Sequence, residues 1–438
     1  MNKNVLDDIL TSMLNYFETD ISDLNITAFK PLQVEHEGKL SEVVIDPPIA
    51  FKYISPYQSA LLAISIIGKN KRCMEDFVRN GSCDLSYQLG EKARFRINIF
   101  FSKGNCSIVL RRLATTVPSF DEIKSPKVFN KIIEEKNGLI LITGATGSGK
   151  STTLAAILRA INENKHIHVV TLEDPIEFVH KSIKATFNQR EQGSDFDTFP
   201  NALRAALRQA PKVILVGEMR DRETMEIGLT AAETGHLVLS TLHTVDAGQT
   251  INRVIGMFDK EEEDQIRLRL SETVRWIVCQ RLLPKKGGGR VAAHEIMGSN
   301  LRTTEIIREG ESIVKTYFNV IEGSEPLGWQ TFESCLTKLY KDSIITEEEA
   351  LLNTTRKSLL RQKIDYVKSE KGEATSDIDK LGLDEDYVKR IEKEFITIEQ
   401  DDSVSQETQE INTNEKTPSP EKDQNPNGKN PLNKPPTK

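Results

Sequence analysis

The nine residues Gly144–Thr152, which read GATGSGKST, constrain the fold of this chain more than any other feature. They follow an apolar, strand-like run, Gly138–Thr143, and precede a helix-forming run, Leu154–Ile161. Strand, glycine-rich loop and helix in this order form the setting of the Walker A phosphate-binding motif, which a chance glycine-rich turn does not supply. We therefore predict an α/β domain that binds a nucleoside triphosphate.

The residue types of this Walker A segment suit phosphate chemistry. Glycines let the backbone close around phosphate oxygens, and the following helix points its positive end at them. Lys150 is expected to reach the β- and γ-phosphates, and the Ser151 hydroxyl to bind Mg²⁺. ATP and Mg²⁺ are the expected ligands, and the predicted nucleotide-binding residues are Gly144, Ala145, Thr146, Gly147, Ser148, Gly149, Lys150, Ser151 and Thr152.

A second apolar strand, Val213–Val216, is followed at once by Gly217 and Glu218. An apolar strand that ends in an acid is typical of a Walker B motif, and it places the acid at the strand edge where phosphates bind. A glutamate there can act as general base on the attacking water. A solvated strand-end carboxylate is the plainer interpretation, but the Walker A segment upstream favours catalysis by Glu218.

The apolar run His168–Leu172 leads into another acidic turn. Its carboxylates, Glu173, Asp174 and Glu177, suit either holding a Mg²⁺-bound water or orienting the nucleophile. A polar turn broken by a proline is an equally good explanation. The residues alone leave the two interpretations open.

Two histidines flank the apolar run Leu237–Ser240, and six arginines stand out elsewhere. His243 at the strand exit suits sensing of a γ-phosphate, but a lone histidine is more often structural, so the residues alone favour a functional role for neither His236 nor His243. An arginine from a neighbouring domain or subunit can neutralise transition-state charge, whereas a solvated basic face is the ordinary alternative. The arginine candidates are Arg94, Arg96, Arg111, Arg112, Arg204 and Arg208.

Pattern and composition divide the 438 residues into parts. Residues 1–115 mix helix-like and strand-like runs and predict a small α+β domain, followed by a linker at 116–125. Residues 126–365 alternate buried-type strands with helices, which predicts a mainly parallel sheet. Residues 366–438 are expected to form a short helix around Glu385–Phe395 and then a disordered, proline-rich tail over 401–438.

Composition excludes several classes of protein. The formal net charge of −7 disfavours a nucleic-acid binder, which normally carries a basic face. None of the five cysteines stands in a Cys-x-x-Cys pair, so a zinc ribbon is not expected and the cysteines suit a reducing cytosol. The N-terminus lacks the apolar region of a signal peptide, and no run is long enough to span a bilayer. We therefore expect a cytoplasmic protein that reaches membranes only through a partner.

The order of motifs resembles the secretion and pilus ATPases of type II and type IV systems, and within them the type IV pilus retraction ATPases PilT and PilU. The resemblance runs from about Asp20 to Asp365. It includes segments similar to the family's Asp box, Walker B and His box. In order, the matching segments are Ser22–Thr27, Arg94–Phe101, Gly144–Thr152, Thr171–Phe178, Gly217–Thr224, Thr241–Ala247, Gln280–Pro284, Ala292–Met297 and Leu327–Phe332.

This resemblance implies a PAS-like N-terminal domain, a RecA-like ATPase domain and a homo-hexameric ring. It assigns Glu218 as the catalytic base and Glu177 as an essential Asp-box residue, and it favours functional roles for His236 and His243. It implies that arginines of the first domain close over the nucleotide. It further implies a motor peripheral to the inner membrane, where turnover acts on the pilus platform protein so that pilins leave the fibre.

Absences and departures refine the expectation. The chain lacks the further N-terminal domain and tetracysteine insertion typical of assembly ATPases, which favours retraction. Residues Ala210–Lys212 replace acidic residues of the family, and the retraction motif expected at Arg302–Glu309 is recognisable only over Ile306–Glu309. These departures resemble PilU, an accessory motor that works beside a second retraction ATPase. The alternatives are a pilus assembly or type II secretion ATPase, or a nucleotide-bound scaffold ring with little turnover.

Overall fold

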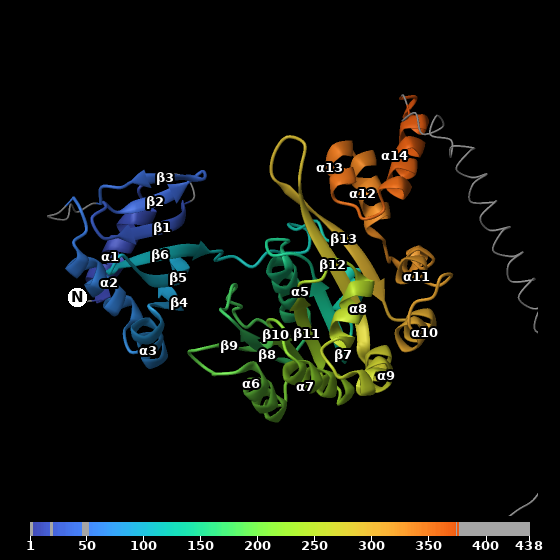
Figure 1. The fold of residues 1–438 in the computed structure, drawn as a ribbon, viewed down its shortest axis with the longest axis horizontal. Coiled ribbons are helices and arrows are strands. Elements are labelled where there is room, and N and C mark those ends of the chain that lie inside the picture. Colours follow the sequence, from blue (N-terminus) through green and yellow to red (C-terminus); the bar gives the residue numbers. More distant parts are fainter. Residues whose placement is uncertain (1–2, 18–20, 46–51, 374, 376–438) are drawn as a thin grey trace, which may run out of the picture. The chain divides into compact units, whose positions relative to one another are not determined.

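A computed structural model describes residues 3–17, 21–45, 52–373 and 375 of the chain. Two β-sheets organise these residues, one formed before residue 114 and one after residue 137 (Figure 1). The helix predicted around Glu385–Phe395 and the tail predicted over 401–438 lie outside the described residues.

The first sheet has six strands in the order β3-β2-β1-β6-β5-β4, and every neighbouring pair is antiparallel. Along β4 the more buried side chains alternate with the more exposed ones, so one face of the strand packs on a core and the other does not. This pattern is typical of antiparallel sheets. The strands are β1 Ile21–Thr27, β2 Gln33–His36, β3 Lys39–Glu42, β4 Ser82–Leu89, β5 Ala93–Ser102 and β6 Asn105–Leu113, and the helices are α1 Lys3–Leu14, α2 Pro56–Ile67 and α3 Lys71–Asn80.

The second sheet has seven strands in the order β13-β12-β7-β11-β10-β8-β9. All neighbours run parallel except β12 and β13, which form an antiparallel hairpin. This arrangement confirms the predicted α/β fold with a mainly parallel sheet. The strands are β7 Gly138–Thr143, β8 His168–Glu173, β9 Thr186–Glu191, β10 Val213–Val216, β11 Leu237–Leu242, β12 Val274–Pro284 and β13 Arg290–Gly298.

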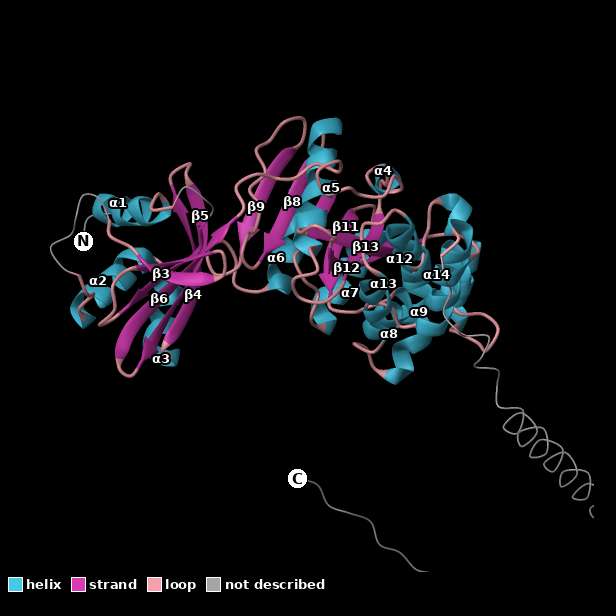
Figure 2. Ribbon diagram, turned by 90° about the horizontal axis from the view of Figure 1, so that it is seen from above, coloured by secondary structure: helices cyan, strands magenta, loops and turns pink. Residues whose placement is uncertain are grey.

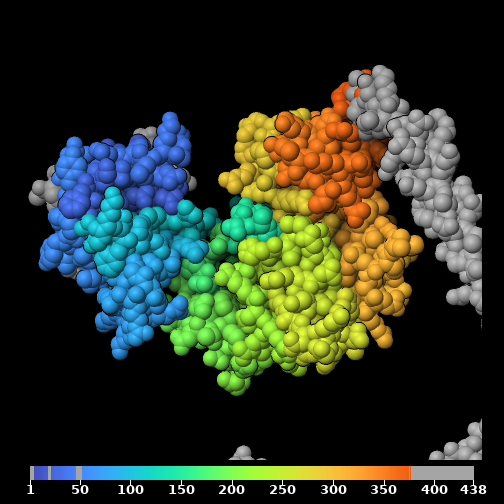
Figure 3. All heavy atoms as spheres, in the orientation of Figure 1, coloured from blue at the N-terminus to red at the C-terminus, as the bar shows by residue number. Residues whose placement is uncertain are grey.

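Helices cover the second sheet. Every residue of β7, β10 and β11 is buried, which requires cover on both faces and explains their mostly apolar sequences. Helices flank these strands in Figure 2, and α12 packs against β13, as the orange and yellow surfaces of Figure 3 show. The helices are α4 Phe129–Ile132, α5 Lys150–Asn164, α6 Phe199–Ala206, α7 Arg222–Glu233, α8 Ala247–Ile255, α9 Glu263–Thr273, α10 Leu301–Glu309, α11 Tyr317–Glu322, α12 Phe332–Lys341, α13 Glu347–Leu352 and α14 Lys357–Lys371.

Each sheet has its own apolar core. One cluster of buried residues runs from Leu6 to Leu110, and the other runs from Val128 to Ile364. The predicted linker, 116–125, falls between them, and α14 continues to Lys371, beyond the predicted boundary at residue 365. The exact domain boundaries stay predictions. Within the described ranges, no helix has the length and apolar character that a membrane crossing requires.

Candidate functional site

The C-terminal ends of four neighbouring parallel strands, β7, β11, β10 and β8, meet at one edge of the second sheet. Thr143, the last residue of β7, lies opposite Leu242 of β11, and Val216 of β10 lies opposite Leu172 of β8. The segments that leave these strands therefore emerge side by side. They are the Walker A segment after β7, the turn after β11 that begins with His243 (the His243 turn), the turn after β10 that contains Glu218 (the Glu218 turn) and the acidic turn after β8. Open parallel sheets bind ligands at this edge.

The Walker A segment forms a tight loop between β7 and α5. Gly144, Gly147 and Gly149 have φ values of +144°, +80° and +90°, which favour glycine. The Lys150 ammonium folds back onto this loop and donates to the carbonyl oxygens of Gly144 and Ala145 at 2.8 and 3.1 Å. The glycine pattern therefore produces the curled loop that the sequence predicts.

Lys150 is buried and lies near carboxylates of two neighbouring turns. Burial lowers its pKa, whereas the negative charges of Glu218 and Glu177 act to raise it. The structure thus brings the predicted phosphate-binding lysine, the predicted base and the predicted Asp-box acid together. These three residues come from segments that follow β7, β10 and β8.

The polar groups of this loop fit a bound phosphate. The Ser148 hydroxyl is buried and has no hydrogen-bond partner among the residues that the structure describes. Ser151, in the first turn of α5, is half-buried beside Lys150, in a position that suits a Mg²⁺ ligand. A buried hydroxyl without a partner, a buried ammonium and a helix N-terminus together favour an anion.

Glu218 is held between an arginine and a histidine side chain. Its Oε2 lies 2.7 Å from an Arg220 Nη, and its Oε1 lies 3.3 Å from His243 Nε2. Burial alone raises the pKa of Glu218, but the hydrogen bonds and charges of Arg220 and His243 outweigh it and lower the pKa overall. The Thr241 hydroxyl donates to the Gly217 carbonyl at 2.7 Å and so ties the His243 turn to the Glu218 turn.

The acidic turn after β8 divides its carboxylates by environment. Glu173 accepts hydrogen bonds from Thr171 and Gln189 at 2.6 and 3.1 Å, and burial raises its pKa. Asp174 is exposed, and Glu177 is half-buried within electrostatic reach of Lys150. Glu177 is therefore the carboxylate of this turn whose placement supports the predicted role.

His236 and His243 lie at opposite ends of β11, because one precedes the strand and the other follows it. His236 Nδ1 lies 3.1 Å from the carbonyl oxygen of Ala231, near the end of α7. The structure brings His243 to Glu218 but does not bring His236 to the Walker A segment. A catalytic role for His236 stays a prediction.

The arginine candidates have varied surroundings. Arg94 is buried and pairs with Glu191 at 2.6 Å, and Glu191 also accepts from the Ile176 amide at 3.1 Å, next to Glu177. Two more candidates form ion pairs with carboxylates. Arg111 pairs with Asp23 at 2.9 Å and Arg204 with Glu223 at 2.6 Å, while Arg96 and Arg208 are exposed and Arg112 is half-buried.

Two residues of the site, Arg220 and Gln280, were not singled out by the sequence. Arg220 lies two residues after Glu218, in a mostly charged segment that is typical of a solvent-exposed turn, so the sequence did not predict its contact with Glu218. Gln280 interrupts the apolar strand β12 and donates to the Ser148 carbonyl at 2.7 Å. A polar residue directly after a buried apolar run is the sequence signal that could have identified Gln280.

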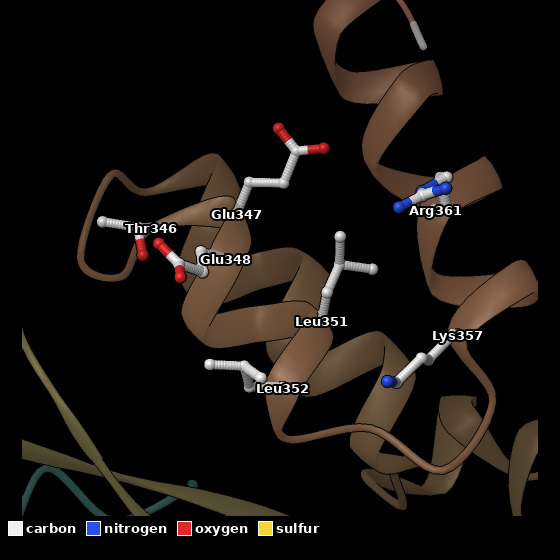
Figure 4. Close-up of a pocket in the computed structure, with 7 residues that line it drawn as sticks. All are labelled: Thr346, Glu347, Glu348, Leu351, Leu352, Lys357 and Arg361. Atoms are coloured by element: carbon white, nitrogen blue, oxygen red, sulfur yellow. The ribbon is translucent and has the colours of Figure 1, made fainter. Parts of the chain in front are cut away.

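Two hollows lie apart from this edge. One, of about 580 Å³, is formed by α13 and α14, where Leu351 faces Lys357 and Arg361 (Figure 4). The other, of about 230 Å³, includes the buried carboxylate of Glu295. Neither is lined by residues of the Walker A segment, so neither is the nucleotide site.

Comparisons with known proteins agree with this geometry. The family profile described as "Type II/IV secretion system protein" matches residues 72–323, more than half of the chain. The chain is 42% identical over 329 residues to the type IV pilus retraction ATPase PilT of Pseudomonas aeruginosa, covering 75% of this chain and 93% of PilT. It is 37% identical over 341 residues to the type IV pilus ATPase PilU of the same organism, covering 78% and 87%. Overall identity thus does not favour PilU over PilT.

Solved structures agree as well. The crystal structure of the pilus retraction motor PilT with bound ADP superposes with a TM-score of 0.70 at 39% identity, covering 80% of this chain and 97% of that one. The Legionella pneumophila ATPase DotB also gives a TM-score of 0.70, at 30% identity, covering 80% and 95%. These likenesses confirm the predicted fold.

Proposed function

This chain belongs to the type II/IV secretion system protein family, and on that premise we propose that it is an ATP-hydrolysing motor for type IV pilus retraction. The observation that carries the proposal is the convergence of Lys150, Glu218 and Glu177 at one sheet edge. Its relatives include a retraction ATPase and, in Neisseria gonorrhoeae, a twitching motility protein that is 44% identical over 275 residues.

The chemistry follows from the placement of these side chains. Lys150 and the backbone amides of the loop would hold the phosphates of ATP, and the Ser151 hydroxyl would hold Mg²⁺, which neutralises phosphate charge when bound. The lowered pKa of Glu218 keeps it ionised and able to accept a proton from water. In this structure Arg220 contacts one oxygen of Glu218 and His243 the other, and each oxygen keeps a lone pair that can accept a hydrogen bond from that water.

The finer parts of the proposal concern assembly and location. We infer a cytoplasmic homo-hexamer that is peripheral to the inner membrane and contacts the pilus platform protein. The exposed side chains of Arg96 and Arg208 support this, because they are accessible to a neighbouring copy of the chain. No nucleic-acid partner is proposed, since the net charge is −7.

The accessory form of this motor is the second candidate. It rests on the family retraction motif, of which only Ile306–Glu309, at the end of α10, is recognisable. Such a protein would act with a second retraction ATPase. An assembly or type II secretion ATPase and a scaffold ring with little turnover remain the alternatives that experiments must separate.

Steady-state hydrolysis separates a motor from a scaffold. We expect Mg²⁺-dependent ATP turnover by the purified chain and its loss in Glu218→Gln, because an amide cannot accept the proton of the water. Glu226→Gln is the matched control, since Glu226 is an exposed glutamate on the neighbouring helix α7. Turnover of Glu218→Gln equal to that of the control would refute the motor.

The phenotype of cells that lack the protein then distinguishes a retraction motor from an assembly motor. A principal retraction motor gives excess surface pili without twitching, and Glu218→Gln cells should match the deletion. Near-normal pilus number with impaired movement identifies the accessory motor. Cells without pili would identify an assembly ATPase and overturn the retraction proposal.

A further inference from the structure

Gln280 is a buried amide next to the Walker A loop. Its side chain belongs to β12 and is only 3% exposed. Because β12 runs parallel to β7 with Cys279 opposite Thr143, the next residue of each strand, Gln280 and Gly144, lie side by side. Gln280 therefore stands where the strand ends and the loop begins.

Both ends of this amide are hydrogen-bonded, and to different parts of the nucleotide segment. Nε2 donates to the carbonyl oxygen of Ser148 at 2.7 Å. Oε1 accepts from the hydroxyl of Thr153 at 2.7 Å. A carbonyl can only accept, so Nε2 must be the atom that faces Ser148. The side chain thus connects the loop to the first turn of α5, the helix that begins with Lys150.

The loop wraps closely around Gln280. A Cβ placed on Gly149 would lie 2.8 Å from Gln280 Nε2, and one on Gly144 would lie 2.3 Å from the backbone carbonyl oxygen of residue 280. Both distances are shorter than Cβ atoms adopt. The Gln280 side chain therefore favours glycine at position 149, and the backbone of β12 favours glycine at position 144, as the positive φ values of both residues also do.

The hydrogen bond to Ser148 also fixes the direction of a backbone amide. In a trans peptide the carbonyl and the following N–H point in opposite directions. Holding the Ser148 carbonyl toward Gln280 therefore points the Gly149 N–H away from β12. Backbone N–H groups of such a loop are the donors that hold phosphate oxygens.

We propose that Gln280 is a positioning residue for ATP: it holds the Ser148–Gly149 peptide and α5 in the arrangement that binds phosphate. This inference rests on the proposed function, because it assumes that the loop binds ATP. Gln280 contacts Ser148 and Thr153, and it acts on the nucleotide only through these two residues. It should therefore affect nucleotide affinity and KM more than kcat.

Gln280→Met tests this directly, because methionine keeps nearly the same volume but can neither donate to Ser148 nor accept from Thr153 in the same way. We expect the Kd of a fluorescent ADP analogue and the KM for ATP to rise about tenfold, as removal of two buried hydrogen bonds would produce. We expect kcat to fall by less than about threefold, since the pair of Lys150 and Glu218 remains.

Gln330→Ala is the matched control. Gln330 Nε2 donates to the His294 carbonyl at 3.0 Å, which is the same kind of bond away from the loop. A general loss of stability would lower the Tm of both variants, but only the Gln280 variant should lose affinity. Gln280→Asn, whose amide is too short to reach both partners, is measured alongside in case Gln280→Met does not fold.

Affinity for ADP decides the outcome. A wild-type Kd in a folded Gln280→Met or Gln280→Asn protein overturns the positioning role. The unsubstituted chain and Lys150→Ala are measured in the same assay. If the unsubstituted chain neither binds ADP nor hydrolyses ATP, the proposed function itself has failed, and that result is distinct from the failure of Gln280.

Discussion

One buried carboxylate, Glu295, should contribute stability to the ATPase core that is lost as pH rises toward 7. Its side chain lies on β13 and is 7% exposed, and it accepts a hydrogen bond from the Ala247 amide at 2.9 Å, at the start of α8. Burial and, to a smaller extent, the nearby charges of Asp246 and Glu333 raise its pKa to about 7, against the hydrogen bond from Ala247 and the charge of Arg281.

The size and sign of the effect follow from linkage. The unfolded carboxyl titrates near its ordinary pKa of 4.5, so between that pH and about 7 the folded protein holds a proton that the unfolded chain has released. The stabilisation is complete below pH 4.5 and is lost as pH rises through about 7. A difference of roughly 2.5 units corresponds to about 3 kcal/mol of unfolding free energy.

Urea unfolding of the unsubstituted chain and Glu295→Gln at pH 5, 6, 7 and 8 tests this value. Glutamine stays neutral, so the stability of the variant relative to the unsubstituted chain should increase by about 2.5 kcal/mol between pH 5 and pH 8. Burial lowers the pKa of His180 and His294 to about 4, which gives the opposite slope, but both proteins share that contribution. Glu348→Gln is an exposed control. A difference that stays constant from pH 5 to pH 8 would refute the reasoning.

Three further predictions concern the catalytic residue, the buried ion pair and the tail. Lys150→Ala should abolish hydrolysis by removing the phosphate-binding cation, and undiminished turnover in a steady-state assay would contradict the Walker A assignment. Arg94→Met should cost about 3 kcal/mol of unfolding free energy, because it leaves the buried Glu191 without its cation. Adding Glu191→Gln to Arg94→Met should cost less than the two single changes summed, which a urea-based double-mutant cycle measures; additive costs would mean that the pair is not coupled. Deleting 401–438 should leave hydrolysis intact, and a loss of turnover would show that the tail acts on the core.

The sequence predicted the central strands well because their environment leaves a clear mark. β7, β10 and β11 are covered on both faces and therefore consist mostly of apolar residues, and the start of each strand was predicted to within a residue. Parallel strands also place their C-terminal ends together, so the convergence of Lys150 and Glu218 follows from the strand directions alone.

Contacts between distant segments were beyond reach of the sequence. The pairing of Arg94 with Glu191 joins residues 97 positions apart, and nothing local distinguishes Arg94 from the exposed Arg96. Gln280 was visible only as a polar residue within a matching segment. Its meaning depends on the order of the strands, which places β12 beside β7 and which no local pattern encodes.

His236 and His243 show that strand direction is a stronger guide than motif membership. The resemblance favoured functional roles for both, although only His243 lies within the matching segment Thr241–Ala247. Yet β11 is parallel to β7, so a residue that precedes β11 lies at the edge opposite the Walker A segment, and a residue that follows it lies beside that segment. The contact of His243 with Glu218 and the contact of His236 with the end of α7 follow from this rule. Since β11 is six residues long, at about 3.3 Å per residue, His236 lies too far from Glu218 to act on the same water, so any part that it plays in hydrolysis must be transmitted through α7 or exerted on a neighbouring copy of the chain.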